Sequence, residues 1–124
     1  VQILTKFAMY SQHEQLHIAS WPGMSLYQPE VYAFGVEAQI TASRSYALEG
    51  GTFVLCSTQV VTETARDFFC SSEEQRKLIG YGGGFARIFG PDGSDLAEAL
   101  PEDGEGILYA DIDLAQIVLA KQAA

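Results

Sequence analysis

The chain has 124 residues, enough for one domain with a hydrophobic core and too few for two. Hydrophobic residues make up 48% of it, which is typical of a globular protein and excludes a disordered chain. Its formal net charge of −9 is opposite to that of a nucleic-acid-binding surface, so no nucleic-acid partner is expected.

The first predicted element is a helix over residues 3–14, because apolar side chains recur there at helical spacing. An apolar strand over residues 15–21 follows, and Pro22-Gly23 stops it. A longer helix is predicted over residues 29–49, with Pro29 in its first turn and Gly50-Gly51 at its end. Residues 52–57 form the next apolar strand, so the pattern indicates a βαβ unit within an α/β fold.

The middle of the chain, residues 62–84, is polar, and we expect a loop with one short helix over residues 72–78. Ser72 is a suitable cap for that helix. The glycine-rich stretch at residues 80–84 matches no nucleotide-binding motif and predicts a turn with close backbone packing.

The last part of the chain predicts a strand at residues 85–89 and a turn at Gly90-Pro91-Asp92-Gly93. A returning segment at residues 94–100, a strand at 105–114 and a helix at 115–124 follow. Eight carboxylates and no Lys or Arg lie between Asp92 and Asp113. We interpret them as a solvated hairpin, since the spacing of a calcium-binding loop is missing.

Candidate catalytic side chains are few. Cys56 ends an apolar strand, where a cysteine is usually a small buried hydrophobe, and Cys70 has no histidine near it in sequence. His13 and His17 flank Glu14, but the helix is expected to end between them, which favours ordinary histidines over metal ligands. The residues therefore predict no metal site, no cofactor and no complete active site.

The two cysteines also help to predict the cellular compartment of the protein. They are too few for a disulfide scaffold and fit no zinc motif. No apolar run approaches 18 residues, and no basic stretch precedes a cleavage site. We therefore predict a cytoplasmic protein with reduced thiols and no membrane partner.

Several segments, taken in order, resemble the part of nitrilases that follows the catalytic cysteine; nitrilases are members of the carbon–nitrogen hydrolase family. The segments are residues 4–22, which end in His17-Ile18-Ala19-Ser20-Trp21-Pro22, then Ser25-Leu26-Tyr27, residues 43–50, Gly82-Gly83-Gly84, residues 88–93 and Tyr109-Ala110-Asp111-Ile112-Asp113-Leu114. The resemblance covers nearly the whole chain.

This resemblance implies a four-layer α-β-β-α sandwich that is active as an oligomer and uses a Glu-Lys-Cys triad. The cysteine thiolate attacks the nitrile carbon to give a thioimidate, the glutamate is the general acid/base, and the lysine stabilises the charged intermediate. Water then releases a carboxylic acid and ammonia. In the family the cysteine comes a few residues before the position of Val1. We therefore expect residues 1–124 to be one partial domain, truncated at both ends, with no catalytic residue and no activity alone.

The resemblance also assigns roles to residues of this chain. Trp21 and Pro22 would form a wall of the pocket for a small-molecule nitrile, with Leu26 and Tyr27 nearby. The helices at residues 3–14 and 29–49 would form a homo-oligomer interface. The polar segment at residues 61–82 falls where nitrilases carry an insertion used in spiral assembly.

Other interpretations stay open. The Trp21 segment can be an aromatic corner that only packs the end of the strand. The whole chain can be a non-catalytic, oligomer-forming module, because half of a sandwich leaves an apolar sheet face for a partner to cover. A small-ligand-binding protein that uses the Trp21 loop is the third hypothesis.

Overall fold

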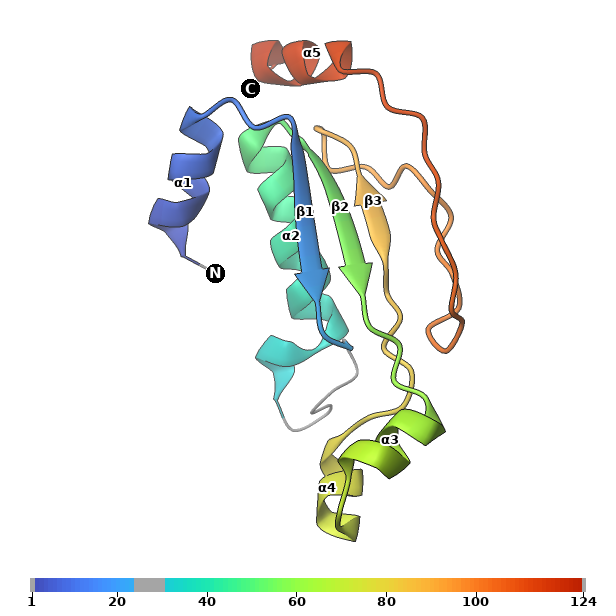
Figure 1. Ribbon diagram of the computed structural model, residues 1–124. Coiled ribbons are helices and arrows are strands. Elements are labelled where there is room, and N and C mark those ends of the chain that lie inside the picture. Colours follow the sequence, from blue (N-terminus) through green and yellow to red (C-terminus); the bar gives the residue numbers. More distant parts are fainter. Residues whose placement is uncertain (1, 24–30, 124) are drawn as a thin grey trace.

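The computed structural model describes residues 2–23 and 31–123 (Figure 1). None of the helices in these ranges is long and apolar enough to cross a lipid bilayer. The elements in chain order are α1 (Ile3–Ser11), β1 (Leu16–Trp21), the 3-10 helix η1 (Tyr32–Phe34), α2 (Val36–Gly50), β2 (Phe53–Thr58), α3 (Glu63–Phe69), α4 (Glu73–Leu78), β3 (Arg87–Phe89) and α5 (Ala115–Ala123).

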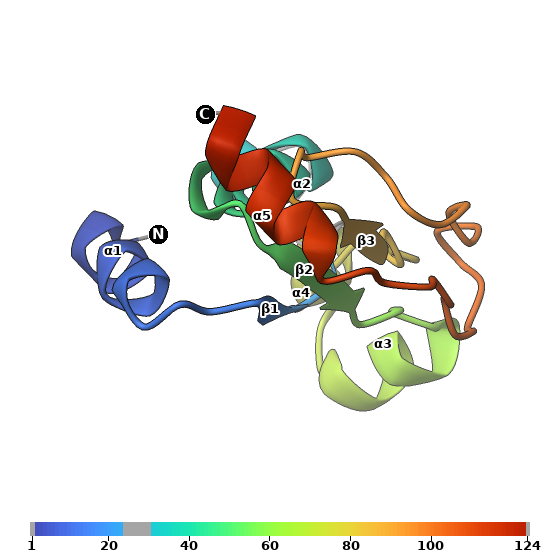
Figure 2. The same ribbon diagram turned by 90° about the horizontal axis from the view of Figure 1, so that it is seen from above.

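The centre of the fold is a three-stranded mixed sheet in the order β1-β2-β3. β1 and β2 are parallel, with Ile18 opposite Leu55, and α2 is the crossover between them. β3 runs antiparallel to β2, with Ile88 opposite Leu55. The predicted βαβ unit is confirmed, and α2 covers one face of the sheet (Figures 1 and 2).

The hydrophobic core lies between α2 and the sheet. Tyr46 and Ala47 of α2 pack there against Val54, Cys56 and Phe89 of the strands. They come together because alternate residues of a strand face one side of the sheet, while residues three and four apart share one side of a helix. The core is therefore built from one face of β2 and β3 and one stripe of α2.

Arg44 ties the turn after β3 to α2. Its guanidinium lies 4.7 Å from the centre of the Phe89 ring and donates hydrogen bonds to the Gly93 carbonyl and to the Asp95 carboxylate. The turn predicted at residues 90–93 is present, with Gly93 at a φ of 79° and its N–H bonded to the Gly90 carbonyl. Gly93 thus takes the backbone conformation that side chains disfavour.

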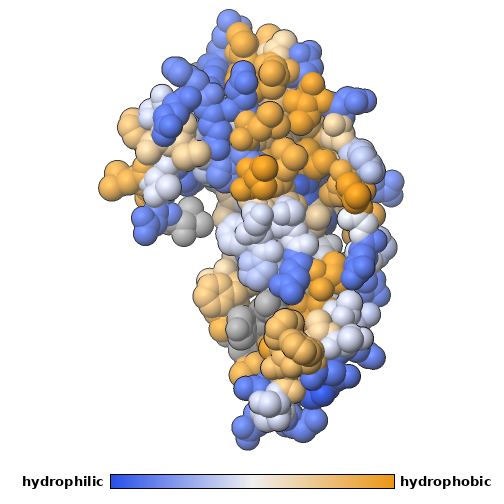
Figure 3. Space-filling view, viewed as in Figure 1, coloured by the Kyte–Doolittle hydropathy of each residue, from blue (hydrophilic) through white to orange (hydrophobic). Residues whose placement is uncertain are grey.

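The opposite face of the sheet is apolar and partly open to solvent. Ile18 is 71% exposed and Leu16 is 47% exposed, although both are strand residues. Figure 3 looks onto this face and shows hydrophobic side chains gathered over its upper part. No helix of the described residues lies over the middle of this face (Figures 1 and 2).

Two helix boundaries differ from the prediction. α1 ends at Ser11 rather than at residue 14, because His13 takes a left-handed φ of 59° that ends the helix before the strand. α2 begins at Val36 rather than at residue 29, since Gly35 is extended (φ −84°, ψ 171°) and separates it from η1. Pro29 lies outside the described residues.

The polar segment at residues 61–82 contains two short helices rather than the one predicted. α4 begins after Ser72, whose hydroxyl accepts a hydrogen bond from the Gln75 N–H at 3.2 Å, so the predicted cap is confirmed. α3 was missed, although Thr62 caps it in the same way through the Ala65 N–H at 3.1 Å.

The glycine-rich stretch packs as predicted. Gly82 and Gly83 have φ values of 82° and 84°, and the Gly84 N–H donates to the Glu102 carbonyl at 2.7 Å. A Cβ atom at Gly84 would lie 2.7 Å from that carbonyl oxygen, so the close backbone approach requires glycine.

The strand predicted over residues 105–114 is wrong for this structure, which has no regular secondary structure at residues 105–113. Ile107 and Tyr109 are more than two-thirds exposed there. A strand needs a neighbour to bond its backbone groups, and none of the described strands pairs with this segment. The returning segment pairs only at Asp95, opposite Phe89.

The predicted C-terminal helix is confirmed as α5, which lies across the end of the sheet where β1 and β2 begin (Figures 1 and 2).

Candidate functional site

The predicted wall residues begin at the carboxyl end of β1. Trp21 is the last residue of that strand and is half-buried, whereas Pro22 directly after it is exposed. Leu26 and Tyr27 lie outside the described residues. In α/β folds the carboxyl ends of parallel strands are where ligand sites commonly form, so Trp21 and Pro22 lie at a suitable edge of the sheet.

Trp21 is held by α2. Its indole N–H donates to the Ser43 hydroxyl at 2.8 Å, and that hydroxyl donates to the Gln39 carbonyl at 3.0 Å. The ring also packs against the hydrophobic core. This arrangement fixes the direction in which the chain leaves β1. It is also the arrangement expected if the Trp21 segment is an aromatic corner that packs the end of the strand.

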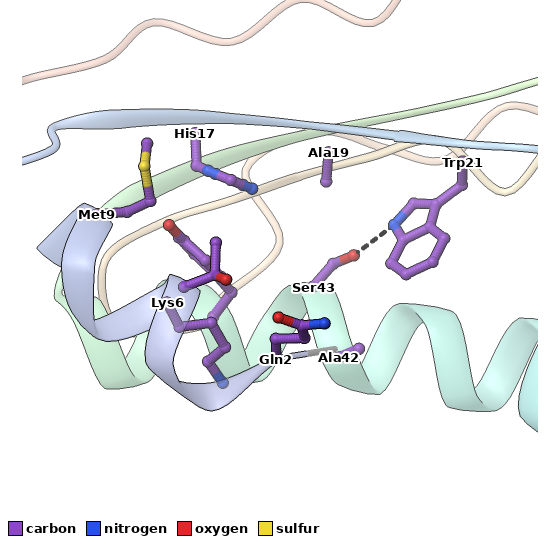
Figure 4. A pocket seen from close by; sticks show the side chains of 10 residues that line it. Gln2, Lys6, Met9, His17, Ala19, Trp21, Ala42 and Ser43 are labelled. Atoms are coloured by element: carbon purple, nitrogen blue, oxygen red, sulfur yellow. Dashed lines mark hydrogen bonds between the residues drawn. The ribbon is translucent and has the colours of Figure 1, made fainter.

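A cavity of about 320 Å³ lies beside Trp21, between α1, β1 and α2 (Figure 4). Alternate residues of β1 project into it from the sheet, and α1 and α2 form its other sides. Its size is at the lower end of the range for small-molecule sites. The lining residues are Gln2, Thr5, Lys6, Met9, His17, Ala19, Trp21, Ala42, Ser43 and Tyr46.

A hydrogen-bonded cluster borders this cavity. The Glu14 carboxylate, whose side chain is only 11% exposed, accepts from His17 Nδ1 at 2.8 Å and from the Tyr46 hydroxyl at 2.5 Å. The His17 ring stacks on the Tyr46 ring at 3.9 Å, and Tyr10 donates from its hydroxyl to the Tyr46 carbonyl at 3.0 Å. The cluster therefore joins α1, β1 and α2.

The cluster changes the acidity of its two phenols. Burial, together with the negative charges of Glu49 and Glu14, raises the pKa of Tyr10 to about 12. Burial also raises the pKa of Tyr46, and the hydrogen bond to Glu14 acts in the same direction. Both phenols are neutral near pH 7 and act there as hydrogen-bond donors.

Glu14, His13 and His17 do not form a metal site. His13 lies in the turn after α1, and His17 is on β1 with Nδ1 bonded to Glu14. No group of three His, Cys, Asp or Glu side chains that could hold a metal ion occurs within residues 2–23 and 31–123.

The two cysteines are poorly placed for nucleophilic chemistry beside Trp21. Cys56 is 2% exposed in the core, and burial raises the pKa of its thiol, which disfavours the thiolate. Cys70 is buried at the end of α3. Neither residue lines the cavity beside Trp21. The burial of Cys56 agrees with its interpretation as a small buried hydrophobe.

Sequence reasoning missed the role of Glu14 and of its partner Tyr46. Glu14 and His17 lie three residues apart, but Tyr46 is 32 residues further along the chain from Glu14. The available signal was the position of Ser43 and Tyr46 among the apolar residues of α2, where polar groups need buried partners.

Comparison with known proteins gives one consistent result. Residues 2–122 match the family model of the carbon–nitrogen hydrolases. The chain is 76% identical over 123 residues to an aliphatic nitrilase from Rhodococcus rhodochrous and covers 34% of that protein. It is 51% identical over 124 residues to a nitrilase from Pseudomonas syringae pv. syringae, of which it covers 37%.

A solved structure agrees with the fold. A carbon–nitrogen hydrolase from Helicobacter pylori G27 superposes with a TM-score of 0.70 at 20% identity, over 97% of this chain and 39% of that chain. The chain thus spans about a third of the length of the relatives that it matches. The family match and the identities together show that the chain belongs to the carbon–nitrogen hydrolase family and has the α/β fold of part of such a protein.

Proposed function

We propose that residues 1–124 are the carboxyl-side part of a nitrilase, an enzyme that hydrolyses organic nitriles to carboxylic acids and ammonia. The observation that carries the proposal is the 76% identity to an aliphatic nitrilase over almost the whole chain. A second protein of that name, also from Rhodococcus rhodochrous, is 54% identical over 124 residues. These names favour an aliphatic nitrile as the substrate.

In this proposal the reacting groups lie outside residues 1–124. A nitrilase needs a thiolate that attacks the nitrile carbon, and the raised pKa and burial of Cys56 are the opposite of what such a thiol requires. The contribution of this chain is the sheet edge at Trp21 and Pro22, which with Leu26 and Tyr27 would line the substrate pocket. The position of Trp21 at the carboxyl end of β1 supports that role.

The same proposal includes a homo-oligomer formed through residues 3–14 and 29–49. Three large apolar side chains of α1, Ile3, Leu4 and Phe7, are each at least 70% exposed, which supports an additional partner surface on this helix. Exposed Phe68 and Phe69 at the end of α3 support a second contact in the segment at residues 61–82. The cytosol is the proposed compartment, since Cys56 and Cys70 are both free.

Residues 1–124 on their own are expected to release no ammonia from aliphatic or aromatic nitriles, because the proposed triad is not among them. The measurement is a sensitive ammonia assay over a panel of nitriles. Turnover by this chain that Cys56→Ala or Cys70→Ala abolishes would overturn the proposed assignment of the nucleophile.

A second candidate function is a non-catalytic module that forms oligomers. The open face of the sheet favours it, since Leu16 and Ile18 are apolar and exposed on an edge strand. The module hypothesis predicts dimers or larger species of residues 1–124 in light scattering, and dissociation by the charge introduced in Ile18→Lys. A chain that stays monomeric at high concentration would eliminate this candidate.

A further inference from the structure

The position of α1 depends on few apolar contacts within the described residues. No residue of α1 is fully buried. Met9 and Tyr10, at its carboxyl-terminal end, are the members that pack against the core. The Tyr10 ring lies so close to α2 that a Cβ atom at Gly50 would be 2.4 Å from it.

Polar contacts supply the rest of the attachment. Glu14 directly follows the turn after α1 and receives one hydrogen bond from β1 and one from α2. Tyr10 adds a hydrogen bond to the backbone of α2 at Tyr46. An ion pair between Lys6, which is 16% exposed, and Glu49, which is 50% exposed, also joins α1 to α2, but contact of its carboxylate with solvent limits its contribution. The buried cluster around Glu14 is therefore the main polar link between α1 and the sheet.

We propose that Glu14, held by His17 and Tyr46, is a positioning residue that sets the angle of α1 and so aligns the nucleophile that precedes this helix. The inference rests on the proposed function, together with the implication of the family resemblance that the attacking cysteine comes a few residues before the position of Val1. Glu14 touches neither substrate nor reacting atoms in this account and acts through the helix.

The length of α1 makes the angle important. Nine residues at a rise of 1.5 Å span about 14 Å, so a tilt of about 5° around the carboxyl end moves the amino end by about 1 Å. A misplacement of about 1 Å at a reacting centre costs roughly 100-fold in rate. Loss of the hydrogen bonds of Glu14 is therefore expected to lower the rate of the chemical step, while the walls of the substrate pocket change little.

The test uses the full-length product of the gene that carries residues 1–124, with steady-state ammonia release from an aliphatic nitrile as the readout. Glu14→Ala removes both hydrogen bonds and is expected to lower kcat by roughly 30- to 100-fold, with KM within about three-fold of the unmodified protein. Glu14→Gln keeps the shape and can bond both partners: its amide oxygen accepts from one of them, and its NH2 group donates to the Tyr46 hydroxyl or to His17 Nδ1 as the other. It is expected to restore kcat to within about ten-fold of the unmodified protein.

Two further variants separate positioning from a loss of folding. Tyr46→Phe keeps the ring that stacks on His17 and removes one hydrogen bond, so a loss of several-fold in kcat with unchanged KM is expected. Glu49→Gln is the matched control at the ion pair with Lys6, and its kcat is expected to stay within two-fold of the unmodified value. Thermal unfolding of every variant accompanies the kinetics.

The outcomes are distinguishable. Full kcat in Glu14→Ala overturns this inference alone, and so does an equal loss in Glu14→Ala and Glu14→Gln, because that result indicates a need for charge rather than for position. A rise in KM in proportion to the loss of kcat/KM also contradicts it. Absence of nitrile turnover by the unmodified full-length protein overturns the proposed function, and this inference with it.

Discussion

Phe89→Ala is expected to remove a large part of the stability of this fold. Phe89 is completely buried, pairs with Val54 across the sheet and lies beneath the Arg44 guanidinium. Truncation of a buried phenylalanine typically costs about 3–5 kcal/mol, because the lost contacts leave a cavity. The free energy of unfolding of a domain of this size is only about 5–15 kcal/mol. Urea unfolding followed by circular dichroism measures the difference.

Leu48→Ala is the matched control, since Leu48 is on α2 one residue beyond the buried Ala47 but is itself 62% exposed. Its expected cost is below about 1 kcal/mol. A Phe89→Ala chain with the same unfolding midpoint as the Leu48→Ala chain would contradict the position of the core between α2 and the strands.

Alkaline pH is expected to destabilise the fold through Tyr10 and Tyr46. Burial raises the pKa of Tyr10 from its usual value of 10.0 to about 12, and the pKa of Tyr46 rises for the same first cause. As the pH rises from 10, the unfolded chain loses phenolic protons before the folded chain does. Stability from these groups is thus complete below pH 10 and is lost as the pH rises through the pKa values of the folded state.

The measurement is the free energy of unfolding between pH 9 and pH 12 (about the range set by the two states of a tyrosine), with the phenolate absorbance recorded in parallel. Tyr10→Phe is expected to flatten part of the pH dependence, because it removes one of the two shifted groups. Ionisation of both tyrosines at the pH of a free phenol, without loss of structure, would show that the cluster around Glu14 is open to water.

Local sequence patterns predict the centre of the fold well. The apolar runs at residues 15–21 and 52–57 can be buried only if the helix between them covers one face of the sheet, and the structure has this parallel pair with α2 as crossover. Ser72 and the glycines at 82–84 were also predictable, because capping and positive φ are properties of single residues and their neighbours.

The largest error, the strand predicted over residues 105–114, comes from dependence on contacts distant in sequence, whereas the helix boundaries depend on the backbone conformation of single residues. The segment at residues 105–113 has strand-like composition, but a strand forms only where another strand bonds its backbone groups, and none of the described strands pairs with it. The start of α2 depends on the extended backbone of Gly35, which no periodicity reveals.

The candidate site also has one part that local sequence patterns predict and another that depends on contacts distant in sequence. Trp21 could be placed at a strand end because the strand and the stop at Pro22 are local features. Its bond to Ser43 and the cluster of Glu14 with Tyr46 required the crossing of β1 over α2, which brings together residues 22 and 32 positions apart. Local patterns predicted Ser43 and Tyr46 only as residues of a helix and gave no sign of these partners.

Ammonia release by the full-length product of the gene that carries residues 1–124, measured over a panel of aliphatic and aromatic nitriles, tests directly whether this protein is a nitrilase. We expect turnover of aliphatic nitriles that persists in both Cys56→Ala and Cys70→Ala, since neither buried thiol is the proposed nucleophile. A folded full-length protein that releases no ammonia from any nitrile of the panel would contradict it.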